Sequence, residues 1–209
     1  MKIIVFGATG MVGKEIVKQA LYNGNTVKAF GRNVFTEGLP DNDKLELVQG
    51  ALFDEGEVYK AIKGCDAVVL AIGGAFDGTD KTRSLGMKNI VKQMEKANVK
   101  RIVALGGMGV LDATDGKLMM EQEDFPAEHF ALSQEHQKAL GFLQSSKLDW
   151  TFVCPPMIEE AAPSGIFATA ANELPQPNHF TIGSGDLALF MLKEITANQF
   201  VKQRVGISS

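Results

Sequence analysis

Three glycines at three-residue spacing are the residues of this chain best suited to bind a ligand: Gly7, Gly10 and Gly13. A glycine turn can hold a pyrophosphate, because the main chain approaches the phosphates without a Cβ in the way. We assign Gly7 to a tight turn, Gly10 to the close approach and Gly13 to the packing of a helix on a sheet. The amides that open the helix would face the anion, with the positive end of the helix dipole behind them. The residues predicted to contact a dinucleotide here are Gly7, Thr9, Gly10, Met11, Val12 and Gly13.

The segments on either side place this turn between a strand and a helix. Residues Lys2–Phe6 are apolar and partly β-branched, as in a buried parallel strand. From Met11 to Leu21 the apolar residues recur at helical spacing, with lysine and glutamate between them. The G-x-x-G-x-x-G spacing alone is a weak signal in a chain with 22 glycines. Its position after a strand and before a helix makes it a prediction of dinucleotide binding.

Strand-like and helix-like segments alternate along the 209 residues. This alternation predicts an α/β fold with a Rossmann-like, doubly wound parallel sheet. We expect a single domain over residues 1–209, with a small irregular C-terminal region at residues 155–180 on the substrate side. The closing segment, Gln203–Ile207, would add an edge strand. The other expected strands are Lys2–Phe6, Thr26–Phe30, Leu45–Val48, Ala67–Ala71, Arg101–Leu105 and Trp150–Cys154, and the expected helices are Met11–Tyr22, Glu55–Ile62, Thr82–Ala97, Ala127–Ser145 and Ser184–Ala197.

The composition argues against several classes of partner. The net charge is −4, so no basic stripe exists to neutralise the phosphates of a nucleic acid. Cys65 and Cys154 lie far apart in the sequence and offer neither a disulfide framework nor metal-ligand spacing. No apolar run approaches the roughly 18 residues of a membrane span, and the first strand begins at once, which is unlike a signal peptide. We therefore expect a cytoplasmic protein without a nucleic-acid, membrane or metal partner.

In a parallel sheet of this kind the ligand lies at the carboxyl ends of the strands, so the residues directly after each strand decide specificity. Gly31-Arg32-Asn33 follows the second strand, where an NAD-preferring site would usually carry an Asp or Glu for the ribose hydroxyls. A guanidinium pairs well with a 2′-phosphate, so Arg32, with Asn33 beside it, favours NADP(H) over NAD(H). The alternative is that Arg32 is a plain exposed loop residue.

The later strand ends complete the predicted cofactor contacts. After the third strand, Leu52 and Phe53 suit a flat adenine ring, and Asp54 either accepts from the adenine amine or caps the following helix. Small residues after the fourth strand would let the cofactor pass close to the backbone. The further predicted contacts are Ala71, Ile72, Gly73, Leu105, Gly106 and Pro155.

Several segments together carry a family resemblance: the G-A-T-G-x-x-G turn, Gly31-Arg32-Asn33, Gly86–Asn89, Val99–Val103 and the late run Leu148–Pro156. With this combination the chain resembles an atypical short-chain dehydrogenase/reductase over essentially its whole length. Within that superfamily it is most similar to the NmrA-like and flavin reductase (biliverdin-IXβ reductase) group. The late run is more specific than the first turn, which many families share. The resemblance implies a Rossmann fold that binds NAD(P).

The residues that catalyse alcohol dehydrogenation in that superfamily are missing here. Its members place a serine after the fifth strand and a Tyr-x-x-x-Lys on the next helix, where the lysine lowers the tyrosine pKa. Gly106–Gly109 takes the place of the serine, and the two tyrosines, Tyr22 and Tyr59, fall in early helices. Lys138 stands where the motif lysine would, but the residue four positions before it is Gln134. The usual tyrosine route is therefore not expected.

The flavin reductase group also lacks that tyrosine and works mainly by placing a flat acceptor over the nicotinamide. Its members carry a histidine after the Pro-Pro pair, where this chain has Met157, which could serve only as a soft apolar wall. Proximity and orientation would then supply most of the acceleration, with solvent as the proton source. His136 is the preferred candidate for proton transfer, with Lys138 beside it, although a lone histidine in a helix is more often exposed or satisfied.

Two irregular and unusually apolar stretches, residues 108–126 and 155–180, are the expected acceptor pocket. The predicted substrate contacts in them are Met108, Phe125, Met157 and Phe167. The same residues could equally cover the sheet edge or form a contact with a second subunit.

Two functions stay open from the sequence. The first is an NADPH-dependent reductase of a flavin, quinone or similar small planar acceptor. The second is a non-catalytic, NmrA-like sensor that binds NADP(H) and acts through a protein partner, which the missing serine and tyrosine favour. The compact length favours the reductase. A sugar-nucleotide epimerase fits less well, because the tyrosine is missing and the C-terminal region is small.

Overall fold

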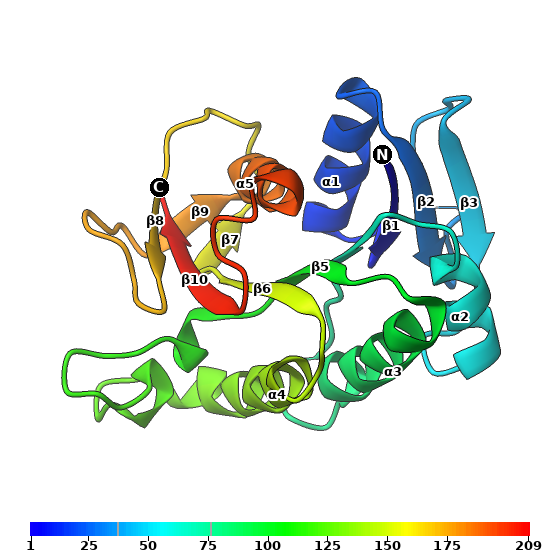
Figure 1. The fold of residues 1–209 in the computed structure, drawn as a ribbon. Coiled ribbons are helices and arrows are strands. Elements are labelled where there is room, and N and C mark those ends of the chain that lie inside the picture. The colour runs from blue at the N-terminus through cyan, green and yellow to red at the C-terminus, as the bar shows by residue number, and fades with distance from the viewer. Residues whose placement is uncertain (37, 76) are drawn as a thin grey trace.

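The computed structural model describes residues 1–36, 38–75 and 77–209. Within these ranges the chain forms one eight-stranded sheet, a separate two-stranded sheet and five α-helices (Figure 1). The large sheet has the order β3-β2-β1-β4-β5-β6-β10-β8, and each neighbouring pair is parallel except β10 and β8. Its strands are β1 (Lys2–Phe6), β2 (Thr26–Gly31), β3 (Leu45–Gln49), β4 (Ala67–Leu70), β5 (Arg101–Leu105), β6 (Asp149–Cys154), β8 (Ala168–Ala171) and β10 (Gln203–Ser208).

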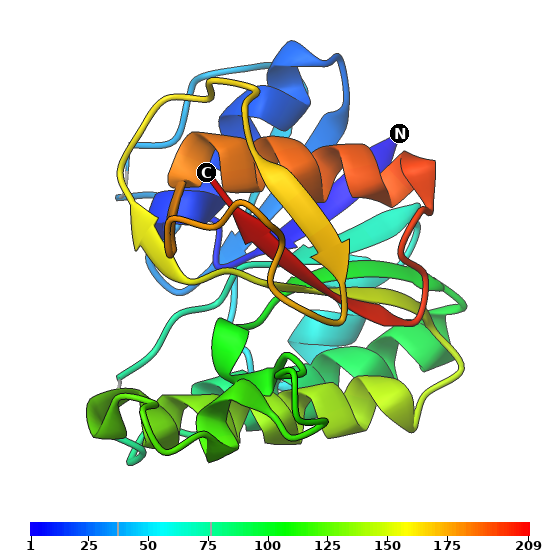
Figure 2. The ribbon, with the colours of Figure 1, turned by 90° about the vertical axis from the view of Figure 1, so that its left-hand side faces the viewer.

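The helices cover both faces of the large sheet, as expected for a doubly wound fold (Figures 1 and 2). Helices α1 and α5 pack against each other on one face, and α2, α3 and α4 lie on the other. The bounds of the helices are α1 (Met11–Tyr22), α2 (Glu55–Ile62), α3 (Thr82–Ala97), α4 (Ala127–Gln144) and α5 (Ser184–Ala197). The predicted α/β, Rossmann-like fold is therefore confirmed, with element ends within a residue of those expected.

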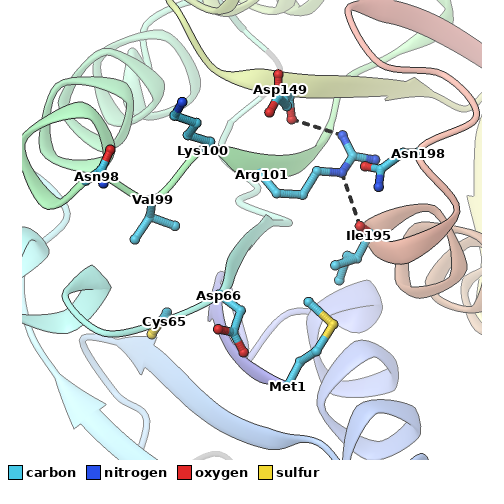
Figure 3. Close-up of a pocket in the computed structure, with 10 residues that line it drawn as sticks. All are labelled: Met1, Cys65, Asp66, Asn98, Val99, Lys100, Arg101, Asp149, Ile195 and Asn198. Carbon is cyan, nitrogen blue, oxygen red and sulfur yellow. Dashed lines mark hydrogen bonds between the residues drawn. The ribbon is translucent and has the colours of Figure 1, made fainter.

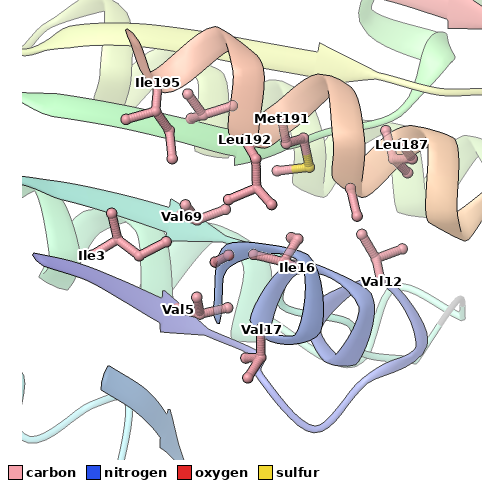
Figure 4. Packing of buried hydrophobic residues seen from close by; sticks show 14 of the residues in the cluster. Ile3, Val5, Val12, Ile16, Val17, Val69, Leu187, Met191, Leu192 and Ile195 are labelled. Carbon is pink, nitrogen blue, oxygen red and sulfur yellow. The ribbon is translucent and has the colours of Figure 1, made fainter. Parts of the chain in front are cut away.

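The core is divided into two apolar layers because side chains along a strand alternate between the faces of the sheet. On β1, Ile3 and Val5 point to the layer under α1 and α5, whereas Ile4 and Phe6 point to the other. Figure 4 shows the first layer, in which Leu192 of α5 packs among apolar side chains of α1 and the sheet. Both faces are buried, which explains why the sequence of β1 is continuously apolar.

One expectation about the C-terminal third is wrong. Gln203–Ile207 was expected as an edge strand, but β10 lies inside the sheet, hydrogen-bonded to β6 on one side and β8 on the other. The edge is β8, whose four small residues, Ala-Thr-Ala-Ala, lack the apolar pattern of a strand. The predicted irregular region, residues 155–180, contains two short strands, β8 and β7 (Met157–Glu159). Strand β7 pairs in parallel with β9 (Thr181–Gly183).

The register of the parallel strands brings their carboxyl ends to one edge. Phe6 of β1 is opposite Phe30 of β2 and Leu70 of β4, so the chain leaves these three strands at the same level. The strand order reverses at this point, since β2 lies on one side of β1 and β4 on the other. Such a switch point is where a doubly wound sheet binds ligands.

Among the five α-helices of the described residues, none has the length and apolar character of a membrane-spanning helix.

Candidate dinucleotide site

The glycine turn after β1 is a tightly packed corner on one side and open on the other. Gly7 has φ +78°, and a Cβ built on it would lie 2.3 Å from the carbonyl oxygen of Ala71. A Cβ on Gly13 would lie 2.0 Å from the carbonyl oxygen of Gly7, so α1 could not pack on the corner with any larger residue. These features agree with the tight turn assigned to Gly7 and the close helix packing assigned to Gly13. Gly10 is different, because its Cβ would meet only the Gly7 oxygen, at an ordinary 3.5 Å.

Helix α1 begins at this open side without a capping side chain. Gly10 is its N-cap residue, no side chain of the described residues accepts a hydrogen bond from its first turn, and that turn contains no acidic residue. The first amides of a helix need an outside acceptor, and the helix dipole favours an anion there. The corner therefore fits a diphosphate, with Gly10 leaving room for it and Thr9, Met11 and Val12 around it.

Arg32 directly follows the carboxyl end of β2. The residue is exposed, and Gln49 donates a hydrogen bond of 2.9 Å to its carbonyl oxygen, which fixes the backbone. Among the described residues its side chain has no hydrogen-bond or ion-pair partner, and the neighbouring Asn33 is exposed as well. A cation in this position is available to a phosphate beside the corner.

Leu52, Phe53 and Asp54, the three residues after β3 that are candidates for contact with adenine, lie in different environments. Oδ1 of Asp54 accepts a hydrogen bond of 2.8 Å from the backbone nitrogen of Glu57, so its role as the cap of α2 is confirmed. Leu52 is held against α3, where Asn89 donates to its carbonyl oxygen at 2.8 Å. Phe53 is 58% exposed, and this ring is the one left available to a ligand.

The loop after β4 is fixed by two residues that sequence reasoning missed. Arg83 on α3 donates to the carbonyl oxygens of Gly74 and Ala75, both at 2.9 Å, and Asp80 accepts from the Ala75 nitrogen at 3.0 Å. These bonds fix Gly74 and Ala75, directly after the predicted stretch Ala71–Gly73. A Cβ on Gly73 would meet open space. No sequence signal points to such residues, because their partners are main-chain atoms, which every residue carries.

His136 on α4 approaches the chain just after β5. A Cβ on Gly107 would lie 3.1 Å from His136 Cδ2 and 3.3 Å from Nε2, so the glycine makes room for this edge of the ring. The side chain is only 7% exposed, packs edge-on against Phe152, and forms no hydrogen bond to any described residue. Burial, with the nearby charge of Arg83, lowers the pKa of His136 to about 3. The ring is therefore neutral near pH 7 and can exchange hydrogen bonds but not store a charge.

Lys138 is held by an ion pair within the same helix. Its Nζ lies 2.8 Å from Oε1 of Glu135, which also pairs with Lys81 at 3.3 Å and accepts a hydrogen bond from Ser84. Burial alone would raise the pKa of Glu135, but these donors outweigh it and hold the pKa below its usual value. The cluster joins α4 to the start of α3. Lys138 thus has a structural partner, and its catalytic role stays a prediction.

The four predicted substrate residues do not share one environment. Phe167 packs edge-on against Phe190 of α5, with ring centroids 6.1 Å apart, so it contributes to the core and is a poor candidate for substrate contact. Met108 is half-buried against the second core layer, and Phe125 is half-buried near Gly109. Met157 is 63% exposed at the start of β7, directly after Pro155 and Pro156. Of the four, Met157 is the most available.

A hollow also lies at the opposite edge of the sheet. This hollow of about 420 Å³ is lined by residues at the amino ends of β1, β4, β5 and β6 (Figure 3). Its buried cation, Arg101, already donates to the carbonyl oxygens of Asp149 and Ile195 and pairs with Glu194 at 3.0 Å. Because these donors are used within the protein, Arg101 offers little to a phosphate.

The glycine corner, the uncapped helix and the switch point together define a dinucleotide-binding protein of the Rossmann class. Residues 7–198 match the model of the NAD(P)H-binding family, and the chain belongs to this family. It is 31% identical to the uncharacterized protein YwnB of Bacillus subtilis over 158 residues, which cover 74% of this chain and 71% of YwnB.

Solved structures agree on the fold. A Burkholderia pseudomallei protein, provisionally described as exported, superposes with a TM-score of 0.87 at 30% identity, covering 100% of both chains. A Streptococcus pneumoniae protein provisionally named an NADH-flavin reductase superposes with a TM-score of 0.86 at 23% identity, covering 100% of this chain and 99% of that one. The Rossmann fold and the NAD(P)H-binding family that the sequence resemblance implied are thereby confirmed.

Proposed function

We propose that this protein is an NADPH-dependent reductase that passes hydride to a flavin, quinone or similar planar conjugated acceptor. The observation that carries the proposal is the uncapped first turn of α1 beside the open face of Gly10, at the switch point of the sheet. The structural similarity to a protein named an NADH-flavin reductase supports the choice of acceptor class.

In this proposal, different residues at the carboxyl edge bind different parts of the cofactor. The first amides of α1 would hold the diphosphate, Arg32 would pair with a 2′-phosphate, and Phe53 would cover the adenine. When bound, NADPH supplies the hydride. The guanidinium of Arg32 is exposed and has no hydrogen-bond or ion-pair partner among the described residues, which supports a preference for NADP(H) over NAD(H).

Catalysis in this proposal depends on placement more than on acid–base chemistry. Gly106 and Gly107 stand in place of a serine, and a Cβ on Gly106 would lie 2.4 Å from the ring of Phe152, so the main chain itself lines this part of the edge. His136 is neutral and its ring nitrogens have no partner among the described residues, so it can donate a hydrogen bond to an acceptor. The proton that accompanies the hydride comes from solvent.

A non-catalytic sensor that binds NADP(H) and acts through a protein partner is the second candidate. It is favoured by the ion pair that occupies Lys138 and by the glycines at the serine position. Half-buried apolar residues such as Met108 and Phe125 would then contribute to a partner or homodimer surface.

One experiment separates the two candidates. The protein is mixed with NADPH and with FMN, FAD or a naphthoquinone in turn, and the absorbance of the reduced nicotinamide is followed. The reductase predicts loss of that absorbance only when protein and acceptor are both present. Tight NADPH binding without any acceptor-dependent loss would contradict the reductase and favour the sensor.

The cellular setting proposed for either function is the reducing cytoplasm. Cys65 and Cys154 are both free and buried, and burial raises the pKa of Cys154 to about 12, so this thiol stays protonated. The acidic net charge of −4 supports a small-molecule ligand over a nucleic acid.

A further inference from the structure

Phe180, just before β9, has an unusual backbone conformation for an aromatic residue. Its φ is +57°, in the left-handed region, where a side chain crowds the neighbouring carbonyl group. The other non-glycine residues with positive φ in the described ranges are Asn98, Asn172, Asn198 and Lys202. Asparagine tolerates this region well, so the use of phenylalanine here carries a cost that asparagine would largely avoid. Conformational strain of this kind is often found at functional positions.

The backbone around Phe180 is fixed by several hydrogen bonds. The side-chain oxygen of Asn178 accepts from the Phe180 nitrogen at 2.7 Å, and the Phe180 carbonyl accepts from the Met157 nitrogen at 3.2 Å. Ser208 on β10 accepts from the His179 nitrogen at 3.1 Å. Despite this, the ring of Phe180 is 54% exposed. The fold therefore holds the backbone firmly while leaving the aromatic face open.

The position of Phe180 links it to the carboxyl end of β6. Strand β7 follows β6 after two prolines, and Met157 is opposite Thr181 in the β7–β9 pair, which Figure 1 shows beside α5. Phe180 therefore lies next to Met157, the exposed residue of the predicted substrate set. A backbone hydrogen bond thus joins two exposed apolar residues just beyond the carboxyl end of β6.

We infer that Phe180 and Met157 form a wall against which the flat ring of the acceptor stacks. This inference rests on the proposed reductase function and names a specificity-determining residue for it. Aromatic rings stack favourably on one another, and a methionine sulfur packs well on a ring. A planar conjugated acceptor is the ligand that such a pair recognises, because neither side chain offers a strong polar contact.

Three substitutions separate the ring from the backbone conformation. Phe180→Ala removes the ring, Phe180→Asn removes it but suits the left-handed backbone, and Phe180→Tyr keeps it. The control is Tyr22→Ala, which removes an exposed aromatic residue at the far end of α1. We expect the Ala and Asn variants to raise the KM for FMN about tenfold and the Tyr variant to stay near the wild type. The affinity for NADPH should be unchanged in all these variants. The control Tyr22→Ala should leave the KM for FMN unchanged as well.

A second readout does not need turnover. FMN is titrated into the protein in the presence of NADP⁺, and its binding is measured by the quenching of flavin fluorescence. The Ala and Asn variants should bind FMN about tenfold more weakly than the wild type. Wild-type KM and FMN affinity in both variants would overturn the role of Phe180 while leaving the reductase intact. If only Ala is impaired and Asn is normal, the backbone conformation rather than the ring matters, which also overturns it. Absence of turnover with every acceptor overturns the proposed function, and absence of FMN binding by the wild type overturns this inference.

Discussion

The two edges of the main sheet differ in what their polar groups have left to bind. At the amino edge, Arg101 lies beside a hollow of about 420 Å³, yet its donors are taken by Glu194, Thr151 and carbonyl oxygens. At the carboxyl edge, α1 opens without a capping side chain from the described residues, and Gly10 has free space in front of it. Buried or converging polar groups without partners favour a ligand that supplies them. In our proposal, the ligand is therefore located by unused hydrogen-bonding groups and not by empty volume.

The largest effect is expected at the amino edge, from Arg101→Ala. This change leaves the buried carboxylate of Glu194 unpaired and should lower the free energy of unfolding by about 3–5 kcal/mol. Lys100→Ala, an exposed neighbour on the same hollow, should have almost no effect. Urea unfolding measures both. A stable Arg101→Ala variant that has lost NADPH affinity would show that the amino edge binds ligand and would break the comparison.

Gly13→Ala tests the packed side of the corner. The new Cβ would overlap the carbonyl oxygen of Gly7 at 2.0 Å, so α1 must shift, and we expect a loss of about 3 kcal/mol of stability. Gly141→Ala on α4 is the matched control, because nothing lies within 4 Å of its Cβ and alanine favours a helix. Thermal unfolding should separate the two variants clearly. Equal melting temperatures would contradict the packing role of Gly13.

Arg32→Asp sharpens the assignment of the carboxyl edge. Loss of a charge-assisted contact of about 1.5–3 kcal/mol should lower the ratio of NADPH to NADH affinity by about 10- to 100-fold. Arg32→Lys, which keeps the charge but not the planar fork, should fall between. Fluorescence titration of both reduced nucleotides gives the ratio. An unchanged ratio would contradict the contact between Arg32 and the 2′-phosphate and would mean that Arg32 is a plain exposed loop residue.

The buried, neutral state of His136 should make the free energy of unfolding depend on pH by about 1–2 kcal/mol. Its folded pKa of about 3 lies below the unfolded value near 6.5, so the unfolded chain binds more protons between these values. Stability should therefore fall as the pH is lowered from 6.5 to 5. In His136→Phe this loss should be smaller by about that amount. Urea unfolding at the two pH values tests it, and identical pH slopes in both proteins would mean that His136 is not buried in its neutral form.

The sequence predicts a structural feature well where only one physical reason explains the residue found at that position. Gly7 and Gly13 are such residues, as are the apolar runs of β1 and β4, which are buried on both faces. The position of Asp54 before α2 also indicates a helix cap, although it could not exclude a ligand contact.

The rest depends on contacts that leave no pattern in the chain. Strand β8 is built from small residues and gains its place by pairing with β10. Arg83 and Asp80 act on main-chain atoms, and Glu135 matters only because the fold brings Ser84 and Lys81 to it. Such residues become visible only when the positions of their partners are known.

The central claim is that the first turn of α1 grips the diphosphate of the cofactor beside Gly10. The most direct test is calorimetric titration of NADPH into the wild type and into Gly10→Ala. A methyl group there meets only ordinary contacts inside the protein, so the variant should fold and melt like the wild type while binding NADPH at least tenfold more weakly. No binding by the wild type, or equal affinity in both proteins, would contradict the account.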